Sequence, residues 1–512
     1  MGTIYTRRGF LRQIGVLALL LSKPTGLRAR HVSKRPNIIF LLSDDQRYNA
    51  MGCMGNPAIK TPNMDKLAAD GVVFDNHYNT TAICMASRAC IMTGMHEYKT
   101  GCNFTYGPLR PEVFARSYPV LLRQAGYRTG FAGKFGFAVT SESNANLWHR
   151  EEGMPIDQFD WWAGWPGQGS YNTAENKYLQ KYAEKYPHVT RALGAAAQNF
   201  IRQSANKDVP FCLSISFKAP HGPVKPDPEF DGMYDGVVFP REKNFGQEAA
   251  EHLPAQAKSG RQYVRLGKAW LKKSDLLARY YQQIYGIDVA ISMIRNELHR
   301  QGVADNTVIL YTTDNGYFCG AHAMGGKVLP YEEGSRAPLI IYDPRHTVSG
   351  AKKRTMALTA NIDIAPTILN LAGLPAPQKM DGRNLLPLLD EPSAEVRESL
   401  LLTQVWGPPK THALAVVTPQ WKYIYWMYGD RDMSAAEELY DMQTDRFELT
   451  NEAQNPLHKT ALTQMQALYH KHIEQWKKDC VSDYQLHGQL ADRNIPLSEK
   501  NFPKQRSDEL GK

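Results

Sequence analysis

Acidic residues are absent from the first 35 positions, and the rest of the chain has almost no excess charge of either sign. The chain has 512 residues and a formal net charge of +9. Eight lysines and arginines lie in residues 1–35, so the remaining residues have a net charge of only +1. Nucleic-acid binding depends on a concentrated basic surface, which a near-neutral body does not supply. We therefore expect no nucleic-acid partner.

Long hydrophobic runs are missing as well. The one extended apolar segment, residues 14–22, is too short to span a bilayer, and we expect no stable membrane span. It follows paired arginines in TRRGFLRQ (6–13), an order typical of a twin-arginine export signal. A general secretory signal or an N-terminal anchor is the alternative. We assign residues 1–30 to the signal, and expect the twin-arginine translocase as a partner and a periplasmic or secreted bacterial protein.

Zinc-type cysteine spacing is also absent. The seven cysteines fit no zinc pattern, and an odd number leaves at least one unpaired after export. Cys212 lies in an apolar run that predicts a core position. Cys84 precedes Arg88 by four residues in TAICMASRACIMTG (81–94). It could be a disulfide partner, a thiolate nucleophile without an evident base, or a chemically modified nucleophile.

Three continuous apolar runs that end in polar residues are present. They are PNIIFLLSDDQ (36–46), PFCLSISFKAPH (210–221) and NTVILYTTDNG (306–316). Runs of this kind suit strands buried on both faces, as in a parallel sheet. Ligands of open α/β sheets bind beyond the carboxyl ends of the strands. The sequence therefore predicts a site at the edge where these runs end.

Helical segments separate the runs. TPNMDKLAADG (61–71) has a threonine cap, a proline in the first turn and a terminal glycine. YPVLLRQAG (118–126) and NIDIAPTILNLAG (361–373) also end at glycine. This alternation predicts an α/β fold, with a large doubly wound mixed or parallel sheet and helices on both faces.

The character of the sequence changes near residue 376, where a proline-rich connector begins. Residues 412–430 read as an aromatic-rich strand pair, and a helix is expected near residues 458–478. We interpret residues 386–512 as a smaller C-terminal α+β subdomain with a short antiparallel sheet. The large α/β domain then spans residues 31–385.

Four oxygen-bearing side chains lie at two of the predicted strand ends. They are Asp44, Asp45, Asp314 and Asn315. Such hard donors suit Ca²⁺ or Mg²⁺ and not zinc or copper. Paired aspartates also occur as capping or turn elements, so one pair alone is ambiguous. Because both pairs follow strands, we expect them to hold one divalent ion, with Ca²⁺ favoured over Mg²⁺.

Four cationic candidates accompany these carboxylates: Arg88, Lys134, Lys327 and His221. Each lysine alone is more often a solvated surface charge. Assembled with a divalent ion, they would form a positively charged clamp for an anion. Such a clamp favours a sulfate or phosphate ester.

The sequence CMASR (84–88) followed by ACIMTG (89–94) resembles the C-x-(P/A)-S-R…T-G signature of type I sulfatases, in the alkaline phosphatase superfamily. Other family segments appear in the family's order over about residues 36–450: the first strand with its Asp-Asp pair, TPNMDKLAADG, APH, TTDNG, GK…YEEGSRAPLI, DIAPT and ELYD. The resemblance implies a sulfuric ester hydrolase whose catalytic domain is residues 31–385.

The resemblance also implies the role of Cys84. A formylglycine-generating maturase would oxidise it to formylglycine (3-oxoalanine), whose hydrate supplies the attacking oxygen. Modified Cys84 would join Asp44, Asp45, Asp314 and Asn315 as ligands of Ca²⁺. The second hydroxyl of the hydrate would then expel sulfate, whereas a thiol or a serine would trap the covalent ester.

The cationic residues receive roles from the same resemblance. Arg88 would steady the hydrate, and Lys134 and Lys327 would bind sulfate oxygens. His221 would protonate the leaving alcohol as general acid and so contact the substrate.

One position departs from the family pattern. Many relatives read G-K-W-H-L-G where this chain reads GKFGFA (133–138), so Gly136 replaces a histidine thought to help deprotonate the diol. His322 is our first candidate for that role and for substrate binding. The alternative is a substrate-pocket or core histidine. Some relatives acting on sulfated glucosamine also lack the histidine, so its absence does not imply inactivity.

The substrate is less well defined. Aromatic residues in 157–172 could line a carbohydrate cleft, although a packed insertion is the favoured interpretation: Trp161, Trp162, Trp165 and Tyr171. The basic segment 258–273 could contact a polyanion, or be a solvated helix face. We expect an exported sulfatase acting on O-sulfate of a sulfated glycan or its oligosaccharides. The alternatives are a phosphodiester or phosphonate monoester hydrolase and a catalytically impaired glycan-binding homologue.

Overall fold

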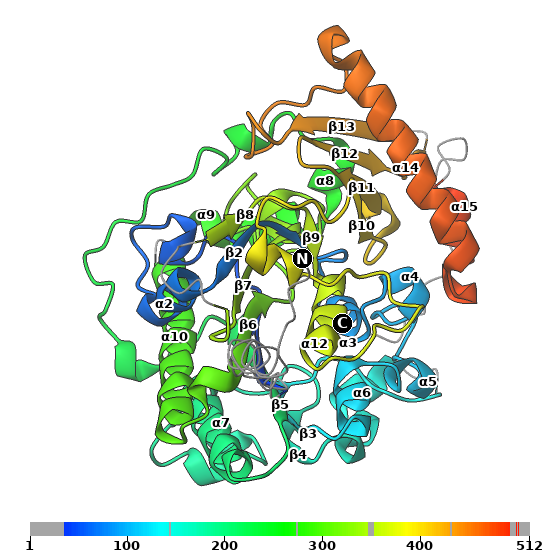
Figure 1. Cartoon of the computed structure of the whole chain (residues 1–512). Helices are drawn as coiled ribbons and strands as arrows, with labels where there is room; N and C mark the ends of the chain where they lie inside the picture. The colour runs from blue at the N-terminus through cyan, green and yellow to red at the C-terminus, as the bar shows by residue number, and fades with distance from the viewer. Residues whose placement is uncertain are drawn as a thin grey trace, which may run out of the picture. The chain divides into compact units, whose positions relative to one another are not determined.

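The computed structural model describes residues 35–142, 145–272, 275–346, 353–430, 433–491, 498 and 500. The expected export signal at residues 1–30 lies outside the described residues and stays a prediction. Figure 1 shows the chain coloured from blue at the N-terminus to red at the C-terminus. Among the described residues, no helix has both the length and the apolar character needed to cross a membrane.

A nine-stranded mixed sheet organises the larger part of the chain (Figure 1). Its order is β4-β3-β5-β1-β6-β7-β2-β8, and β9 pairs with β2. The strands are β1 Asn37–Asp44, β2 Val72–Tyr78, β3 Arg128–Lys134, β4 Trp161–Trp165, β5 Phe211–Pro220, β6 Thr307–Thr313, β7 Arg336–Tyr342, β8 Lys353–Thr355 and β9 Thr359–Ala360. Neighbours from β4 to β6 are parallel, so their carboxyl ends share one edge.

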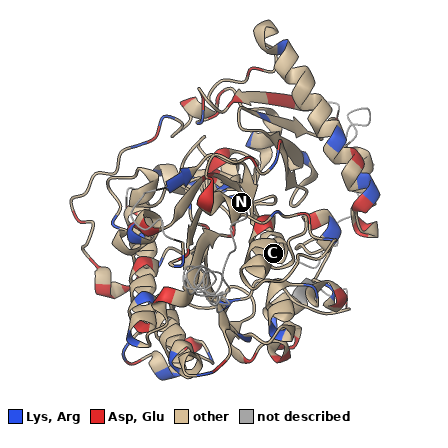
Figure 2. Cartoon of the chain, in the orientation of Figure 1, with Lys and Arg blue, Asp and Glu red and all other residues tan. Residues whose placement is uncertain are grey.

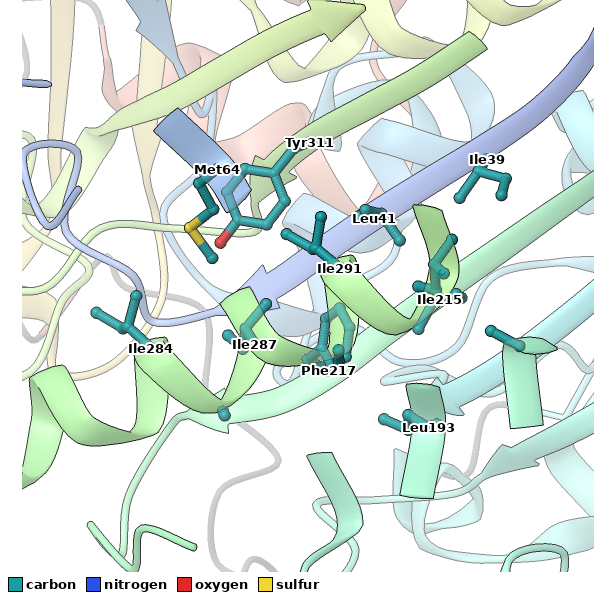
Figure 3. Close-up of a cluster of buried hydrophobic side chains, with 14 of the residues drawn as sticks. Ile39, Leu41, Met64, Leu193, Ile215, Phe217, Ile284, Ile287, Ile291 and Tyr311 are labelled. Atoms are coloured by element: carbon teal, nitrogen blue, oxygen red, sulfur yellow. The ribbon is translucent and has the colours of Figure 1, made fainter. Parts of the chain in front are cut away.

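One face of this sheet is covered by three helices, α2 (Pro62–Asp70), α7 (Val189–Ala205) and α10 (Leu276–Arg300). Apolar residues of α10 recur every three or four positions and form a stripe: Ile284, Ile287, Ile291, Ile294 and Leu298. Ile39 and Leu41 of β1 belong to the same cluster, and Figure 3 shows these side chains between α10 and the strands.

The opposite face receives the alternate side chains of β1, because successive strand residues point to opposite sides. Ile38 and Phe40 pack with helices α3 (Cys84–Thr93), α6 (Tyr118–Gln124) and α12 (Ile364–Leu371). Helices therefore cover both faces, and the expected α/β fold class is confirmed. The three predicted strand runs became β1, β5 and β6, which are neighbours in the sheet.

A smaller antiparallel sheet follows, in the order β10-β11-β12-β13. Its strands are β10 Leu400–Gln404, β11 Ala413–Val417, β12 Trp421–Trp426 and β13 Ala436–Asp441. Helix α14 (Lys459–Asp479) packs on one face through Tyr469 and Trp476 (Figure 1). The predicted small antiparallel sheet is thus confirmed. The domain boundary at residues 385 and 386 stays a prediction.

Buried ion pairs connect the smaller sheet to the start of helix α11 (Glu332–Ser335), which lies between β6 and β7. Lys422 of β12 donates to Glu332 Oε1 at 2.6 Å and lies 2.8 Å from Glu448 Oε1. Glu448 Oε2 also accepts from the backbone N–H of Glu332 at 2.8 Å. All three side chains are fully buried, so removing one partner would leave an uncompensated charge.

Acidic and basic residues are interspersed along the same helices and loops (Figure 2). Buried charged residues are the more informative group, because ionised side chains are rarely buried without partners. Several lie at the carboxyl edge of the large sheet: Asp44, Asp45, Arg88, Lys134 and Asp314.

Candidate active site

The carboxyl ends of four neighbouring strands supply most of the site. Asp44 ends β1, Lys134 ends β3, and Asp314 follows β6. Register places Asp44 beside Pro220 of β5, and Ser43 beside Thr313 of β6. His221 follows Pro220 directly. The parallel pairing therefore brings together residues that are far apart in the sequence.

Helix α3 begins at Cys84, and all ten of its residues are buried. The Cys84 thiol donates to Asp44 Oδ1 at 3.4 Å and accepts from Lys327 Nζ at 2.8 Å. Arg88 lies one turn further along, and residues four apart share a helix face. The spacing in CMASR therefore directs both side chains to the same place.

Arg88 is 2% exposed and holds two carboxylates together. Its Nε donates to Asp314 Oδ2 at 2.8 Å, and its Nη2 lies 3.2 Å from Asp44 Oδ2. Its Nη1 donates to Lys134 O at 2.7 Å and to the Ser216 hydroxyl at 2.5 Å. These contacts fix the guanidinium against the carboxylates of Asp44 and Asp314.

The oxygen atoms at this edge fit a hard divalent cation. Asn315 Nδ2 donates to Asp45 Oδ1 at 2.6 Å, whereas Asn315 Oδ1 is buried and has no hydrogen-bond partner. Burial and the charge of Asp44 raise the pKa of Asp314 to about 6. A positive ion would satisfy the Asn315 oxygen and relieve the carboxylate repulsion. Ligand atoms of Asp44, Asp45, Cys84 and His221 lie within 4.8 Å of one another.

An unmodified Cys84 is poorly suited to be a nucleophile. Burial, with a smaller contribution from Asp44, raises the pKa of its thiol to about 12. The thiol would therefore be protonated at neutral pH, and the thiolate is the reactive form. All seven cysteines lie in the described part of the chain and are free, so a disulfide does not explain Cys84.

Both predicted lysines reach the same carboxylates. Lys134 is fully buried, and its Nζ donates to Asp44 Oδ2 at 2.5 Å. Lys327 contacts Asp45 Oδ1 and lies 3.8 Å from Asp44 Oδ1. Burial alone would lower the pKa of Lys327, but Asp45 and Cys84 outweigh it and raise that pKa well above its usual value. Lys327 is therefore positively charged.

His221 lies at the more open side of the site. Its side chain is 21% exposed, compared with 0% for Asp44, and its Nε2 lies 3.8 Å from Asp45 Oδ2. Its Nδ1 donates to Gly222 O at 2.7 Å, which leaves Nε2 facing the carboxylates. Burial lowers the pKa of His221 to about 4, against the opposing effect of Asp45.

Gly136 occupies a position where no side chain fits. Its φ is +92°, and a Cβ there would lie 2.5 Å from Arg88 Cδ. Arg88 therefore fills the space next to the backbone at this position. The departure from the family pattern has a local physical basis: any side chain at residue 136 would strain the backbone and displace Arg88.

We expect Gly136→Ala to lower turnover at least about 10-fold, because a displacement near 1 Å in a catalytic group is enough for such a loss. The positive φ adds about 1 kcal/mol of strain. Turnover and the free energy of unfolding in urea would be measured. Gly302→Ala is the matched control, because Gly302 has a φ of +67° and a Cβ added there would meet no atom within 4 Å. Equal activity in both variants would contradict the explanation.

His322 is not brought together with Cys84. It is fully buried, its Nδ1 donates to Ala249 O at 3.0 Å, and its Nε2 lies 4.0 Å from Glu333 Oε2. It forms a separate group with Glu333 and Glu448. The suggested role of His322 in place of the missing histidine stays a prediction, and this geometry gives it no support.

Lys218 was missed by the sequence reasoning. Lys218 is 3% exposed. Burial lowers the pKa of Lys218 to about 8, although the negative charges of Asp44 and Asp45 act to raise it. Its Nζ donates to Gln168 O at 3.1 Å and lies 5.0 Å from the centre of the Tyr171 ring. A lysine inside a mostly apolar strand, three residues before His221, was the available signal.

The tryptophan-rich segment forms packed structure. Trp161–Trp165 is strand β4, at one edge of the large sheet, and Trp162 stacks on Phe131 with ring centres 5.2 Å apart. The Tyr171 hydroxyl donates to His221 O at 2.6 Å. The segment therefore packs against the sheet and holds the backbone of His221. This packing agrees with the favoured interpretation of a packed insertion.

Comparison with protein-family models gives two matches. The model described as Sulfatase matches residues 36–374, and the model described as N-sulphoglucosamine sulphohydrolase, C-terminal, matches residues 320–479. The first match includes Cys84, Arg88, Lys134, His221 and Lys327. It covers well over half of the chain.

Individual relatives agree with these models. An N-acetylglucosamine-6-O-sulfatase of Bacteroides thetaiotaomicron is 29% identical over 82% of this chain and 83% of its own length. An N-acetylglucosamine-6-sulfatase of Homo sapiens is 30% identical over 73% of this chain and 68% of its own length.

Solved structures share the fold. A protein in complex with its substrate D-glucosamine-2-N,6-O-disulfate has a TM-score of 0.69 and 26% identity, covering 87% of this chain and 99% of that chain. A phosphonate monoester hydrolase of Agrobacterium radiobacter has a TM-score of 0.71 over 86% of this chain and 96% of its own, but its 22% identity supports similarity of fold alone. The family model and these relatives establish that the chain belongs to the sulfatase family and is a sulfuric ester hydrolase.

Proposed function

We propose that the protein removes O-sulfate from a sulfated glycan or its oligosaccharides, with a sulfated glucosamine unit as the first candidate substrate. The observation that carries the proposal is that Cys84, the residue to be modified, and three cations contact buried carboxylates at one edge of the large sheet. The cations are Arg88, Lys134 and Lys327. The names of the N-acetylglucosamine sulfatases and the ligand of the similar structure support the sugar class.

Cys84 would act after oxidation to formylglycine by a maturase. Hydration of the aldehyde places two hydroxyl groups on one carbon, at the position where the thiol contacts Asp44 and Lys327. One hydroxyl attacks sulfur and the alcohol leaves. The second hydroxyl then loses its proton, the aldehyde re-forms, and sulfate departs. A single hydroxyl or thiol offers no such second step.

The cations would bind and orient the sulfate group. Lys134 contacts Asp44, and Lys327 contacts Asp45 and the Cys84 sulfur, so both could bind oxygens of a group attached to residue 84. Arg88 holds the cluster in place through Asp314 and Asp44. Asp44, Asp45, Asp314 and Asn315 would hold Ca²⁺, with Mg²⁺ less favoured. When bound, the ion supplies positive charge that neutralises the sulfate oxygens.

His221 would donate a proton to the leaving alcohol. Its pKa of about 4 describes the site without substrate. An arriving sulfate ester adds negative charge beside Nε2, which favours the protonated imidazolium. The partial exposure of this side chain suits a group that meets the sugar portion of the substrate.

The proposal also includes maturation in the cytoplasm and export through the twin-arginine translocase. The protein would then be periplasmic or secreted. The translocase carries folded proteins, which is compatible with a site assembled before export. Support comes from the paired arginines and the short apolar run of the leader.

The test is a desulfation screen with protein co-expressed with a maturase. The panel would contain defined sulfated saccharides, an aryl sulfate, and matched phosphodiester and phosphonate monoester substrates. We expect sugar O-sulfates to be cleaved with the highest kcat/KM, and chelation to abolish turnover until Ca²⁺ is returned. Faster cleavage of the phosphorus esters would favour the alternative hydrolase. Glycan affinity with unmodified Cys84 and no turnover would favour an impaired homologue.

A further inference from the structure

The basic segment that begins near Lys258 contains an uncommon helical turn. Residues Gln262–Gly267 form the π-helix η9, and Arg261 is its N-terminal flanking residue. Single π-helical turns within helices occur frequently at functional sites. Arg261 is an exposed side chain. Its surroundings decide what this turn can contribute.

One side of the turn is fixed to the loop that carries Lys327. The backbone N–H of Gly325 donates to Gln262 O at 2.9 Å. A Cβ on Gly326 would lie 2.9 Å from Leu266, and one on Gly267 would lie 1.8 Å from Ala323 O. The two glycines let the backbones approach closely, so Arg261 has a defined position relative to Lys327.

The other side of the turn meets Trp406. The Arg261 guanidinium lies 5.0 Å from the centre of the Trp406 ring, in cation–π geometry. Gln404 Nε2 donates to Trp406 O at 2.7 Å. Trp406 packs against the small apolar cluster that contains Ile83 and Val328. These two residues adjoin Cys84 and Lys327 in the chain, so the Arg261–Trp406 pair borders the candidate active site.

Arg261 differs from Arg88, Lys134 and Lys327 in having no anionic partner among the residues that the structure describes. Within the described residues, no hydrogen bond or ion pair joins Arg261 to a carboxylate, whereas Lys134, Lys327 and Arg88 each contact one. Burial and the like charge of Arg265 lower the pKa of Arg261, and the carboxylate of Asp45 in the site acts in the opposite direction. A guanidinium that is held against an aromatic ring and has no carboxylate partner in the described part of the chain is suited to bidentate binding of a carboxylate or a sulfate.

We propose that Arg261, oriented by Trp406, forms a subsite for a second anionic group of the substrate. The chemistry is a sulfate or carboxylate in addition to the sulfate that is cleaved, either on the same sugar or on its neighbour. This subsite rests on the proposed function, because it selects among sulfated sugars at the same active site. Lys134 and Lys327 bind the reacting sulfate, and Arg261 distinguishes doubly from singly charged substrates.

The test compares three substrates with the matured, metal-loaded enzyme. They are 6-O-sulfated N-acetylglucosamine, glucosamine carrying N- and 6-O-sulfate, and a disaccharide joining a uronic acid to the 6-O-sulfated sugar. We expect Arg261→Gln to lower kcat/KM about 10- to 100-fold for the disulfated sugar, the uronate disaccharide or both. The change for the singly charged sugar should stay within about 3-fold. The affected substrate identifies the anion as sulfate or carboxylate.

Two further variants sharpen the result. Arg261→Lys keeps the charge without the fork and should recover part of the lost preference. Arg35→Gln is the matched control, because Arg35 also lies over an aromatic ring, Tyr127 at 5.2 Å, but at the amino end of β1. It should change none of the three rates.

Equal losses on all three substrates, or no loss on any, would overturn the subsite while leaving the sulfatase proposal intact. Failure of the unsubstituted enzyme to cleave any sulfated sugar would instead overturn the proposed function, and the subsite with it. Melting temperatures measured in parallel would show whether each variant is folded.

Discussion

A Cys84→Ser variant is expected to lose turnover by about 10³-fold or more and to accumulate as a sulfated enzyme. Serine is close to cysteine in size, so its hydroxyl should lie where the thiol contacts Asp44 Oδ1 and Lys327 Nζ. That hydroxyl can attack sulfur once. No second hydroxyl is present on the same carbon, so the covalent ester has no internal route to release sulfate.

Two measurements check this expectation: steady-state turnover, and the intact mass of the variant after exposure to substrate. The mass should rise by one SO₃ group, carried on the peptide that contains residue 84. Cys90→Ala is the matched control, because Cys90 lies in the same helix and is also fully buried. It should retain modification of Cys84 and most of the activity. A serine variant with full turnover would rule out the two-hydroxyl mechanism.

Replacing His221 by alanine is expected to produce the second large effect, and its size should depend on the leaving group. Protonation by a positioned side chain contributes about 10²- to 10⁴-fold. A sugar alcohol is a poor leaving group and should show the full loss. An aryl sulfate with an acidic phenol leaves without protonation and should show little loss. The test measures kcat across a series of sulfates whose leaving groups differ in pKa.

His299→Ala is a suitable control for this series, since His299 is exposed in the last turn of α10. It should leave every rate unchanged. A uniform loss for His221→Ala across all leaving groups would show that the histidine positions substrate and does not transfer a proton.

Much of the fold was predictable because local sequence patterns indicate the strands and helices. Continuous apolar runs marked β1, β5 and β6, and the alternation with capped helices indicated parallel strands. Parallel strands that are neighbours must end at one edge, so the polar residues after them could be expected to meet. The residues that need only this rule, Asp44, Asp314 and His221, were identified from sequence.

Residues whose importance depends on packing between distant segments were not predictable in this way. The position of Lys218 in a predicted strand was a signal of burial, but only the structure shows that its ammonium group donates to Gln168 O beside the Tyr171 ring. The sequence showed that Gly136 lacks a histidine, but only the structure shows that Arg88 fills that space. His322 stands five residues before Lys327, and yet its side chain enters a different buried group. Sequence proximity cannot specify direction within a loop.

The buried Lys422 links mutational sensitivity of the smaller sheet to the chemistry of the larger one. Its partner Glu332 comes five residues after Lys327 and begins helix α11 (Glu332–Ser335), which follows the Lys327 loop. A substitution at Lys422 would therefore disturb the segment next to Lys327 and be measured as a defect in sulfate binding or release. Lys422 itself is fully buried in the smaller sheet. Directed-evolution libraries confined to the first 385 residues would overlook such positions. Substitutions in the smaller sheet therefore need the same activity measurements as substitutions beside Cys84.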